Sequence, residues 1–447
     1  MKQKKFSLYS KSKISSYKKS ILVDSDKSIS IRSFLFSSIS QGISYVKNIL
    51  ESEDVFSTIN CLKKLGVKIE KRGPKFYSIY GKGLGSLGAK KNLQLNFGNS
   101  GTLARLLISI LSTTPGIEIK VKGDNSLNKR NMKELIILMT KFGAEFYPKD
   151  KFKFPLKIIS TDMPIGINYE AGVSAQLKSS VILAGLNSFG LTKIIEKNKS
   201  RDHSENLLIE NSHAIKISKN KNKIIKIYGK KFLNPLNIKI PGDPSSAAFF
   251  TALTILNQNS KIKIRNVGLN STRIGFYELL KKHGAKIKFK NIKKNNNEVY
   301  GDLHVQSCKI KPIQAPEEYY VKSTDEYPIL FVIAALTNGV SVFKGIGGLA
   351  NKESNRIKEM QKILSQIGIK SKASNNQIKI FGKNFIEKKK FKVKVGNLGD
   401  HRIAMSSLIL SLITGINTNI KNFETVYTSS PSFLKIIKYL GGKFETY

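Results

Sequence analysis

The stretch Leu62-Lys63-Lys64-Leu65-Gly66-Val67-Lys68-Ile69 contains the pattern that decides the fold. An amphipathic helix ends there on a glycine, which readily takes the left-handed conformation that stops a helix, and a short alternating strand follows. The same order of helix, glycine and strand recurs around Gly143, Gly284, Gly368 and Gly441. A sixth, weaker copy centres on His213, for which we predict the left-handed conformation that glycine supplies elsewhere.

The six copies lie 70 to 84 residues apart, which is longer than the roughly 20 to 50 residues of solenoid repeats. Each unit can hold two helices and several strands, so we predict an α/β fold with three units in each of two domains. One domain would comprise residues 24–241, and the other would combine 1–23 with 242–447. The basic N-terminal stretch has no apolar core of a signal peptide, so we predict a retained tail and a first strand near Lys19 to Val23.

Composition limits the class of protein. Lysine and arginine total 76 against 31 acidic residues, a net charge of +45, which makes a basic nucleic-acid-binding protein one alternative. However, only nine of the basic residues are arginine, and the lysines are scattered among Ile, Asn and Ser. No apolar run approaches the roughly 20 residues of a membrane span, and the two cysteines lack metal-binding spacing. We therefore expect a soluble, cytoplasmic, monomeric protein without nucleic-acid or membrane partners and without a metal.

Arginine in so lysine-rich a chain marks positions that need a planar bidentate donor. Gly98-Asn-Ser-Gly-Thr-Leu-Ala-Arg105 places glycines before an apolar helix, which can cradle an anion on backbone N–H groups, although an ordinary cap fits the same pattern. Asp26-Lys-Ser-Ile-Ser-Ile-Arg32 offers an ammonium, a hydroxyl and a guanidinium, a set suited to phosphate or carboxylate. A solvated helix start explains that stretch equally well.

Further polar stretches open the helices predicted later in the chain. Ser174-Ala-Gln precedes an apolar run, and Arg201-Asp-His-Ser-Glu205 has the form of a capping box at Ser204. In Lys352-Glu-Ser-Asn-Arg356 the acid Glu353 lies between two cations and could exchange a proton with a substrate hydroxyl. The Lys-Asn-rich segments 219–223 and 291–297 are predicted to be loops between strands.

Eight such stretches, in this order along nearly the whole chain, resemble 5-enolpyruvylshikimate-3-phosphate (EPSP) synthase in the branch with Ser-Ala-Gln. They are Asp26-Lys-Ser-Ile-Ser-Ile-Arg32, Gly98-Asn-Ser-Gly-Thr-Leu-Ala-Arg105, Ser174-Ala-Gln, Ser200-Arg-Asp-His, Pro241-Gly-Asp-Pro-Ser-Ser-Ala, Asp325-Glu-Tyr-Pro, Lys352-Glu-Ser-Asn-Arg356 and Gly399-Asp-His-Arg402.

The resemblance implies two inside-out α/β domains, each of three βαβαββ repeats, the enolpyruvyl transferase fold. It also implies the reaction, in which the enolpyruvyl group of phosphoenolpyruvate passes to the 5-hydroxyl of shikimate 3-phosphate and phosphate is released, a step of chorismate and aromatic amino acid biosynthesis. No metal or organic cofactor is implied.

The resemblance also implies roles for individual residues. Those expected to bind shikimate 3-phosphate are Lys27, Ser28, Arg32, Ser174, Ala175, Gln176, Arg201, Asp325 and Lys352. Those expected to bind phosphoenolpyruvate are Lys27, Gly101, Arg130, Gln176, Arg356 and Arg402. Asp325, Glu353 and Lys27 are the expected catalytic residues.

Some positions depart from the family pattern. Asp24-Ser25 stands where Pro-Gly usually precedes Asp-Lys-Ser, and Ser430 stands where an aromatic residue commonly precedes Pro431. An inactive relic of the fold is therefore a further alternative. The enolpyruvyl transferase that acts on UDP-N-acetylglucosamine is the nearest rival, but it carries a cysteine in an active loop, and neither Cys61 nor Cys308 lies in such a stretch.

Overall fold

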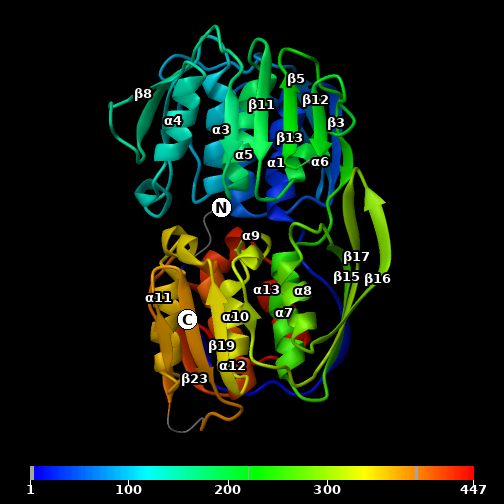
Figure 1. The fold of residues 1–447 in the computed structure, drawn as a ribbon, viewed down its shortest axis with the longest axis vertical. Coiled ribbons are helices and arrows are strands. Elements are labelled where there is room, and N and C mark those ends of the chain that lie inside the picture. Colours follow the sequence, from blue (N-terminus) through cyan, green and yellow to red (C-terminus); the bar gives the residue numbers. More distant parts are fainter. Residues whose placement is uncertain (1–4, 220, 388–390) are drawn as a thin grey trace. The chain divides into compact units, whose positions relative to one another are not determined.

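The structure is a computed structural model that describes residues 5–219, 221–387 and 391–447. The chain forms two compact units (Figure 1). Unit 1 comprises the described residues of 1–24, 241–293 and 299–447, and unit 2 comprises 25–240 with 294–298. The chain therefore passes from one unit to the other at Asp24–Ser25 and at Ile240–Pro241, and the short segment 294–298 belongs to unit 2 again.

Unit 2 contains three four-stranded sheets, in the orders β14-β3-β5-β4, β6-β7-β9-β8 and β10-β11-β13-β12. The strands are β3 (Gln41–Lys47), β4 (Lys68–Gly73), β5 (Phe76–Lys82), β6 (Gln94–Asn96), β7 (Glu118–Lys122), β8 (Glu145–Tyr147), β9 (Leu156–Ile159), β10 (Asn168–Ala171), β11 (Leu191–Glu196), β12 (Ile215–Lys219), β13 (Lys223–Tyr228) and β14 (Asn237–Lys239). The helices are α1 (Lys27–Ile39), α2 (Glu53–Lys64), α3 (Gly101–Ser112), α4 (Lys133–Lys141), α5 (Ala175–Leu186) and α6 (His203–Leu208), with a 3-10 turn, η1, at Leu127–Lys129.

Unit 1 repeats this plan with the sheets β16-β17-β15-β2, β18-β19-β21-β20 and β22-β23-β1-β24. Its strands are β1 (Leu8–Ser10), β2 (Lys18–Leu22), β15 (Lys261–Gly268), β16 (Lys286–Asn295), β17 (Glu298–Gln306), β18 (Gln314–Ala315), β19 (Gly339–Lys344), β20 (Ser371–Ala373), β21 (Gln377–Gly382), β22 (Lys392–Val395), β23 (Asn417–Ile420) and β24 (Glu445–Thr446). Its helices are α7 (Pro244–Leu256), α8 (Gly275–Lys282), α9 (Glu318–Ser323), α10 (Tyr327–Ala335), α11 (Arg356–Ser365), α12 (His401–Thr414) and α13 (Phe433–Tyr439), with 3-10 turns η2 (Gly347–Asn351) and η4 (Phe423–Thr428).

One helix of each repeat is buried on all sides, which makes the units inside-out. Helices α1, α3 and α5 contact one another inside unit 2, and α7, α10 and α12 do so inside unit 1. In α1 every residue from Ile29 to Ile39 is buried. Two of its serines donate their hydroxyls back to the helix backbone, Ser33 to the carbonyl of Ser30 at 2.8 Å and Ser38 to that of Leu35 at 2.7 Å. A helix without a charged face is stable only when such burial surrounds it.

The predicted repeats are confirmed. Each sheet combines a parallel strand pair, such as β6 with β7, with antiparallel neighbours, such as β7 with β9. The glycine after each outer helix has a positive φ, from 70° to 104°, at Gly66, Gly143, Gly284, Gly368 and Gly441. The predicted first strand is also present as β2.

Three expectations about local structure were wrong. His213 has no left-handed backbone conformation; the helix of that repeat ends five residues earlier, and the His213 ring stacks on Phe232 with 4.4 Å between ring centroids. Segment 291–297 is not wholly a loop, because β16 extends to Asn295. The N-terminal tail contains strand β1, which pairs with β23 and β24.

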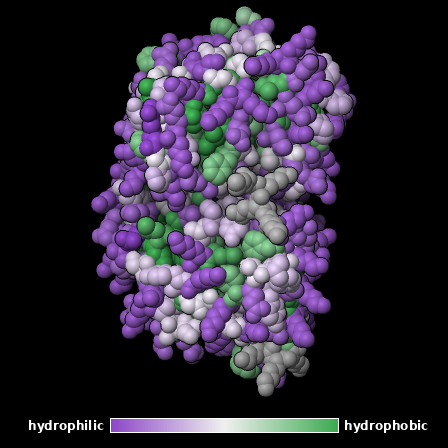
Figure 2. Space-filling model, turned by 180° about the vertical axis from the view of Figure 1, so that it is seen from behind, coloured by the Kyte–Doolittle hydropathy of each residue, from purple (hydrophilic) through white to green (hydrophobic). Residues whose placement is uncertain are grey.

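Hydrophilic residues, purple in Figure 2, cover most of the visible face and do not form a single band. This distribution agrees with the scattering of lysine in the sequence. Among the described residues, no helix is long and apolar enough to cross a membrane.

Candidate active site

The start of α1 presents Lys27, Ser28 and Arg32 in unit 2. Asp26 caps this helix by accepting the N–H of Ile29 at 2.9 Å, and the ammonium of Lys27 pairs with the carboxylate of Asp54 at 2.9 Å. Arg32 is buried one turn later, where its Nη1 donates to the carbonyl of Ser28 at 3.2 Å. The first turn of α1 thus holds one cation paired with a carboxylate and one cation that is buried.

The start of α3 is the predicted glycine loop. Ser100 caps the helix by accepting the N–H of Leu103 at 3.2 Å, and Gly101 is buried as the first helical residue. A Cβ on Gly101 would lie 2.9 Å from Nη1 of Arg105 and 3.0 Å from Nη1 of Arg130. The absence of a side chain at Gly101 thus allows two guanidinium groups to approach the end of the helix.

The start of α5 is joined to that of α3. Ser174 caps α5, and Nε2 of Gln176 donates to the hydroxyl of Thr102 at 2.9 Å. The predicted residues of the second and third stretches are therefore neighbours. Arg130, from the loop after η1, lies at the start of α3, and its Nη2 donates to Oδ1 of Asn99 at 2.6 Å.

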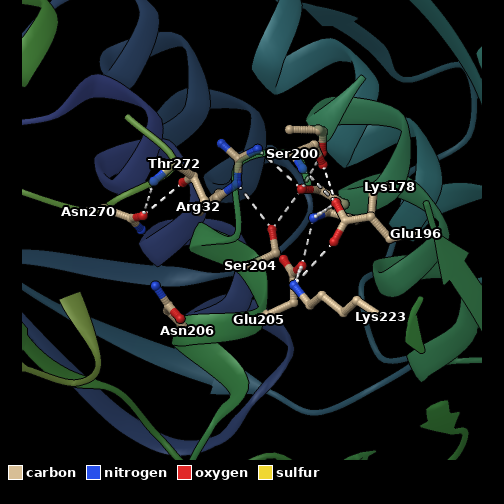
Figure 3. Close-up of polar contacts among 12 residues, drawn as sticks. Arg32, Lys178, Glu196, Ser200, Ser204, Glu205, Asn206, Lys223, Asn270 and Thr272 are labelled. Carbon is tan, nitrogen blue, oxygen red and sulfur yellow. Dashed lines mark hydrogen bonds and ion pairs between the residues drawn. The ribbon is translucent and has the colours of Figure 1, made fainter. Parts of the chain in front are cut away.

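The predicted capping box at Ser204 was wrong. Asp202 is the residue before helix α6, and Ser204 lies inside the helix. Its hydroxyl instead accepts a hydrogen bond from Nε of Arg32 at 3.1 Å (Figure 3). The same hydroxyl donates to Ser179 at 2.8 Å. Ser204 is thus a direct partner of Arg32 that the sequence pattern assigned to another role.

Unit 1 brings together Asp325, Glu353 and Arg356. The guanidinium of Arg356 is fully buried and lies 2.7 Å from Oε2 of Glu353 and 3.7 Å from Oδ1 of Asp325. Asp400 completes the group, with its Oδ2 at 2.9 Å from Nε of Arg356. Burial alone would lower the pKa of Arg356, but Asp400, Glu353 and Asp325 raise it above its ordinary value. No role was predicted for Asp400 from the sequence, although it stands in the Asp-His-Arg stretch.

Arg402 lies two residues after Asp400, in the first turn of α12. Asp400 caps the helix by accepting the N–H of Arg402 at 2.9 Å. The guanidinium is buried 5.8 Å from the ring centre of Phe249. Within residues 5–219, 221–387 and 391–447, its Nε and Nη1 have no hydrogen-bond partner. A buried cation with unsatisfied donors is costly unless an anion binds to it.

The groups at the helix starts of each unit are suited to binding anions, and within unit 1 two carboxylates lie beside the guanidinium of Arg356. Guanidinium groups and capped helix starts can hold phosphate and carboxylate groups, and Asp325 and Glu353 can exchange protons. Lys352 adjoins Glu353, and Arg201 lies in unit 2 just before α6. In the part of the chain that the structure describes, no group of three or more His, Cys, Asp or Glu residues could hold a metal ion.

The family model for EPSP synthase (3-phosphoshikimate 1-carboxyvinyltransferase) matches residues 11–437. The chain belongs to the EPSP synthase family. Among its relatives, the 3-phosphoshikimate 1-carboxyvinyltransferase of Zymomonas mobilis is 36% identical over 427 residues, covering 95% of this chain and 94% of the relative. That of Bacillus subtilis is 36% identical and covers 95% of this chain and 97% of the relative.

Solved structures agree with the EPSP synthase family and its fold. The EPSP synthase of Acinetobacter baumannii superposes with a TM-score of 0.84 at 33% identity, covering 99% of this chain and all of the other. The enolpyruvyl transferase NikO from Streptomyces tendae has a TM-score of 0.74 at 11% identity, covering 99% of each chain, and supports the fold alone. The predicted family and enolpyruvyl transferase fold are thus confirmed.

Neither cysteine of this EPSP synthase family member has the character of an active-site thiol. Cys61 lies in α2, where burial raises its pKa to about 12, so its thiol stays protonated at neutral pH. Cys308 follows β17, and its sulfur accepts the N–H of Lys286 at 3.3 Å. The cysteine-dependent rival within the same fold is therefore not favoured.

Two departures from the family pattern are partners of one another. Asp24 is buried in unit 1, and its Oδ2 accepts the hydroxyl of Ser430 at 2.9 Å, the hydroxyl of Ser432 at 2.7 Å and the N–H of Ser432 at 2.9 Å. Asp24 in place of proline and Ser430 in place of an aromatic residue thus form a single hydrogen-bonded group.

Proposed function

We propose that this protein is a 3-phosphoshikimate 1-carboxyvinyltransferase, which transfers the enolpyruvyl group of phosphoenolpyruvate to the 5-hydroxyl of shikimate 3-phosphate and releases phosphate. The observation that carries this proposal is the family match over residues 11–437. The buried, unsatisfied guanidinium of Arg402 supports it from the structure, because an anionic substrate would satisfy its donors.

Shikimate 3-phosphate would bind mainly to the residues of unit 2. Arg32 and Arg201 supply guanidinium groups, and the capped start of α5 at Ser174, Ala175 and Gln176 supplies backbone N–H groups for the phosphate. The other proposed contacts to this substrate are Lys27, Ser28, Asp325 and Lys352.

Phosphoenolpyruvate carries a phosphate and a carboxylate, so it needs several fixed cations. Arg130, Arg356 and Arg402 would provide bidentate donors, and Lys27 would provide a point charge. Gln176 would donate to the same substrate, and Gly101 would leave room for it beside α3.

The reaction requires two opposed proton transfers. The 5-hydroxyl loses a proton as its oxygen bonds to C2 of phosphoenolpyruvate, and the methylene carbon gains one. Elimination then expels phosphate and removes a proton from the new methyl group. Asp325, Glu353 and Lys27 are the proposed groups for these transfers. The guanidinium of Arg356 lies beside the carboxylates of both Asp325 and Glu353.

The test is release of inorganic phosphate by the purified protein. Release that requires both substrates supports the proposal, and its absence at every substrate concentration contradicts it. The inactive relic predicts no release, although binding would persist. We also propose that the protein acts as a monomer without a nucleic-acid partner, which light scattering and binding at physiological salt would test.

A further inference from the structure

A lysine without any exposed side-chain surface lies beneath the proposed shikimate 3-phosphate site. Lys178 is on α5, and its ammonium lies 2.7 Å from Oε1 of Glu196 and 2.7 Å from Oε1 of Glu205. The side chains of Lys178 and Glu196 are 0% exposed and that of Glu205 is 2% exposed. Figure 3 shows the three side chains converging from α5, β11 and α6.

Lys223 completes a cluster of two cations and two anions. Its ammonium lies 2.9 Å from Oε1 of Glu205 and 3.3 Å from Oε2 of Glu196, and its side chain is 15% exposed. Burial alone would raise the pKa of Glu196, but the ammonium groups of Lys178 and Lys223 and the hydroxyl of Ser200 lower it below its ordinary value. The four charges therefore balance inside the unit.

The ion pair between α5 and α6 runs beside the hydrogen bonds that hold Arg32. In the chain, Ser179 directly follows Lys178, and Ser204 directly precedes Glu205. Nη2 of Arg32 donates to the hydroxyl of Ser179 at 3.2 Å and its Nε to that of Ser204 at 3.1 Å. A shift of α6 against α5 would separate these two serines and release the guanidinium.

Glu196 connects the same cluster to the loop of Arg201. Its Oε1 accepts both the N–H of Ser200 at 2.8 Å and the hydroxyl of Ser200 at 2.6 Å. Ser200 immediately precedes Arg201. The position of the cluster therefore affects the positions of Arg32 and Arg201, the two arginines that we assign to shikimate 3-phosphate.

Stability alone gives little reason to bury such charges. Replacing a buried ion pair by apolar residues is often neutral or stabilising, because desolvation offsets most of the attraction. The exposed pair of Lys197 and Glu170 at the end of the same sheet has its charges 2.6 Å apart without burial. A buried cluster of charges is instead suited to fixing the orientation of the side chains around a binding site.

We propose that Lys178, Glu196, Glu205 and Lys223 are positioning residues for shikimate 3-phosphate: they hold α5, α6 and the Ser200 loop in the register that aims Arg32 and Arg201 at this substrate. The inference rests on the proposed function. It assigns no contact between the four residues and the substrate.

The experiment compares Lys178→Met with the charge-balanced double variant Lys178→Met/Glu205→Gln. Steady-state kinetics give KM for each substrate, calorimetry gives the Kd of shikimate 3-phosphate, and thermal unfolding gives Tm. Lys197→Met is the matched control, because it removes an exposed lysine of the same sheet. Wild-type phosphate release is measured first, so that failure of the proposed function is recognised separately.

We expect Lys178→Met to have a lower Tm and a KM for shikimate 3-phosphate raised at least about tenfold, since small misplacements of binding groups have effects of that order. The KM for phosphoenolpyruvate should change much less. The double variant should recover most of the lost Tm and keep the raised KM and Kd for shikimate 3-phosphate. Lys197→Met should match the wild type.

A double variant that binds shikimate 3-phosphate as tightly as the wild type would overturn the inference, because the cluster would then serve stability alone. If Lys178→Met does not fold, the double variant and Glu205→Gln decide the question by the same Kd. A wild-type protein that neither turns over nor binds shikimate 3-phosphate contradicts the proposed function, and the inference with it.

Discussion

Arg356 and Arg402 are both buried at helix starts in unit 1, but their guanidinium groups have opposite surroundings. Three carboxylates lie around Arg356, whose Nη1 alone makes no hydrogen bond among the described residues. Arg402 lacks such partners at both Nε and Nη1 among the same residues. A substrate anion would therefore compete with carboxylates at Arg356 and would meet unsatisfied donors at Arg402. We expect Arg402 to contribute more to binding phosphoenolpyruvate.

Arg402→Lys is expected to lower kcat/KM for phosphoenolpyruvate about 10- to 100-fold, because an ammonium cannot make two parallel hydrogen bonds and one charge-assisted bond is worth about 1.5–3 kcal/mol. Arg265→Lys, at an exposed position of β15, is the control for the loss of an arginine. Steady-state kinetics of the two variants check this. Near-normal activity in Arg402→Lys would show that a positive charge at this position is sufficient for activity and that the planar guanidinium is not required.

Glu353→Gln is expected to reduce kcat by about 10² to 10⁴, the range for a positioned acid or base. Substrate affinity should persist, because the amide keeps the shape of the carboxylate and can still accept from Nη2 of Arg356. Separate measurements of kcat and of substrate Kd distinguish the two effects. If only affinity falls, Glu353 serves to orient Arg356, and Asp325 becomes the candidate for proton transfer.

Gly101→Ala is expected to raise KM for phosphoenolpyruvate without unfolding the protein. The new methyl would lie about 3 Å from the ends of Arg105 and Arg130, which are flexible and can move, so the cost should appear as misplaced cations. Gly88→Ala is the control, because a Cβ there meets no described atom within 4 Å. An unchanged KM in Gly101→Ala would mean that Arg130 does not bind this substrate.

At the scale of elements, the ion cluster joins α5, β11, α6 and β13, and it should make the stability of unit 2 depend on pH. The pKa of Glu196 is lower in the folded state than its unfolded value of about 4.3. The cluster therefore stabilises the fold above that pH, and this contribution is lost as the pH falls through the folded pKa.

Glu196→Gln is accordingly expected to lower Tm by about 10 °C near pH 7, because Lys178 and Lys223 would then share Glu205 as the single carboxylate of the buried cluster. The difference from the wild type should narrow as the pH falls below the unfolded value of about 4.3 and should vanish once the pH is below the lower pKa of folded Glu196. Glu170→Gln, at an exposed pair, should show no difference at either pH. A gap that is constant with pH would contradict the assignment to ionisation.

The same elements show what the sequence could predict and what it could not. Glycine at the helix ends was predictable, because the left-handed backbone has a local cause, and Gly66 and its four counterparts confirm it. The prediction for His213 was wrong because helix α6 already ends at Leu208. Ser204 failed because its partner Arg32 is 172 residues away in the chain. The residue types suited to anion binding could be predicted from the sequence, whereas contacts between residues far apart in the chain, such as Asp24 with Ser430, could not.

At the scale of the whole molecule, the net charge of +45 should produce only weak, salt-sensitive attachment to nucleic acid. Counterion release makes such attachment fall steeply with salt, by about 10³ to 10⁵ between 50 and 200 mM when six to ten phosphates are contacted. We expect the affinity for a DNA duplex to vanish over this range while enzymatic activity persists. Tight binding at 200 mM salt would revive the nucleic-acid alternative.

Strand β1 pairs with β23 and β24 near the C-terminal end of the chain, and β2 pairs with β15. During synthesis, both strands therefore remain unpaired until their partner strands leave the ribosome, hundreds of residues later. Residues 25–240 form almost all of unit 2 without interruption, so they can fold first, as N-terminal units commonly do. Newly made chains should become protected from protease in this segment early, and β1 should remain cleavable until the last strands emerge.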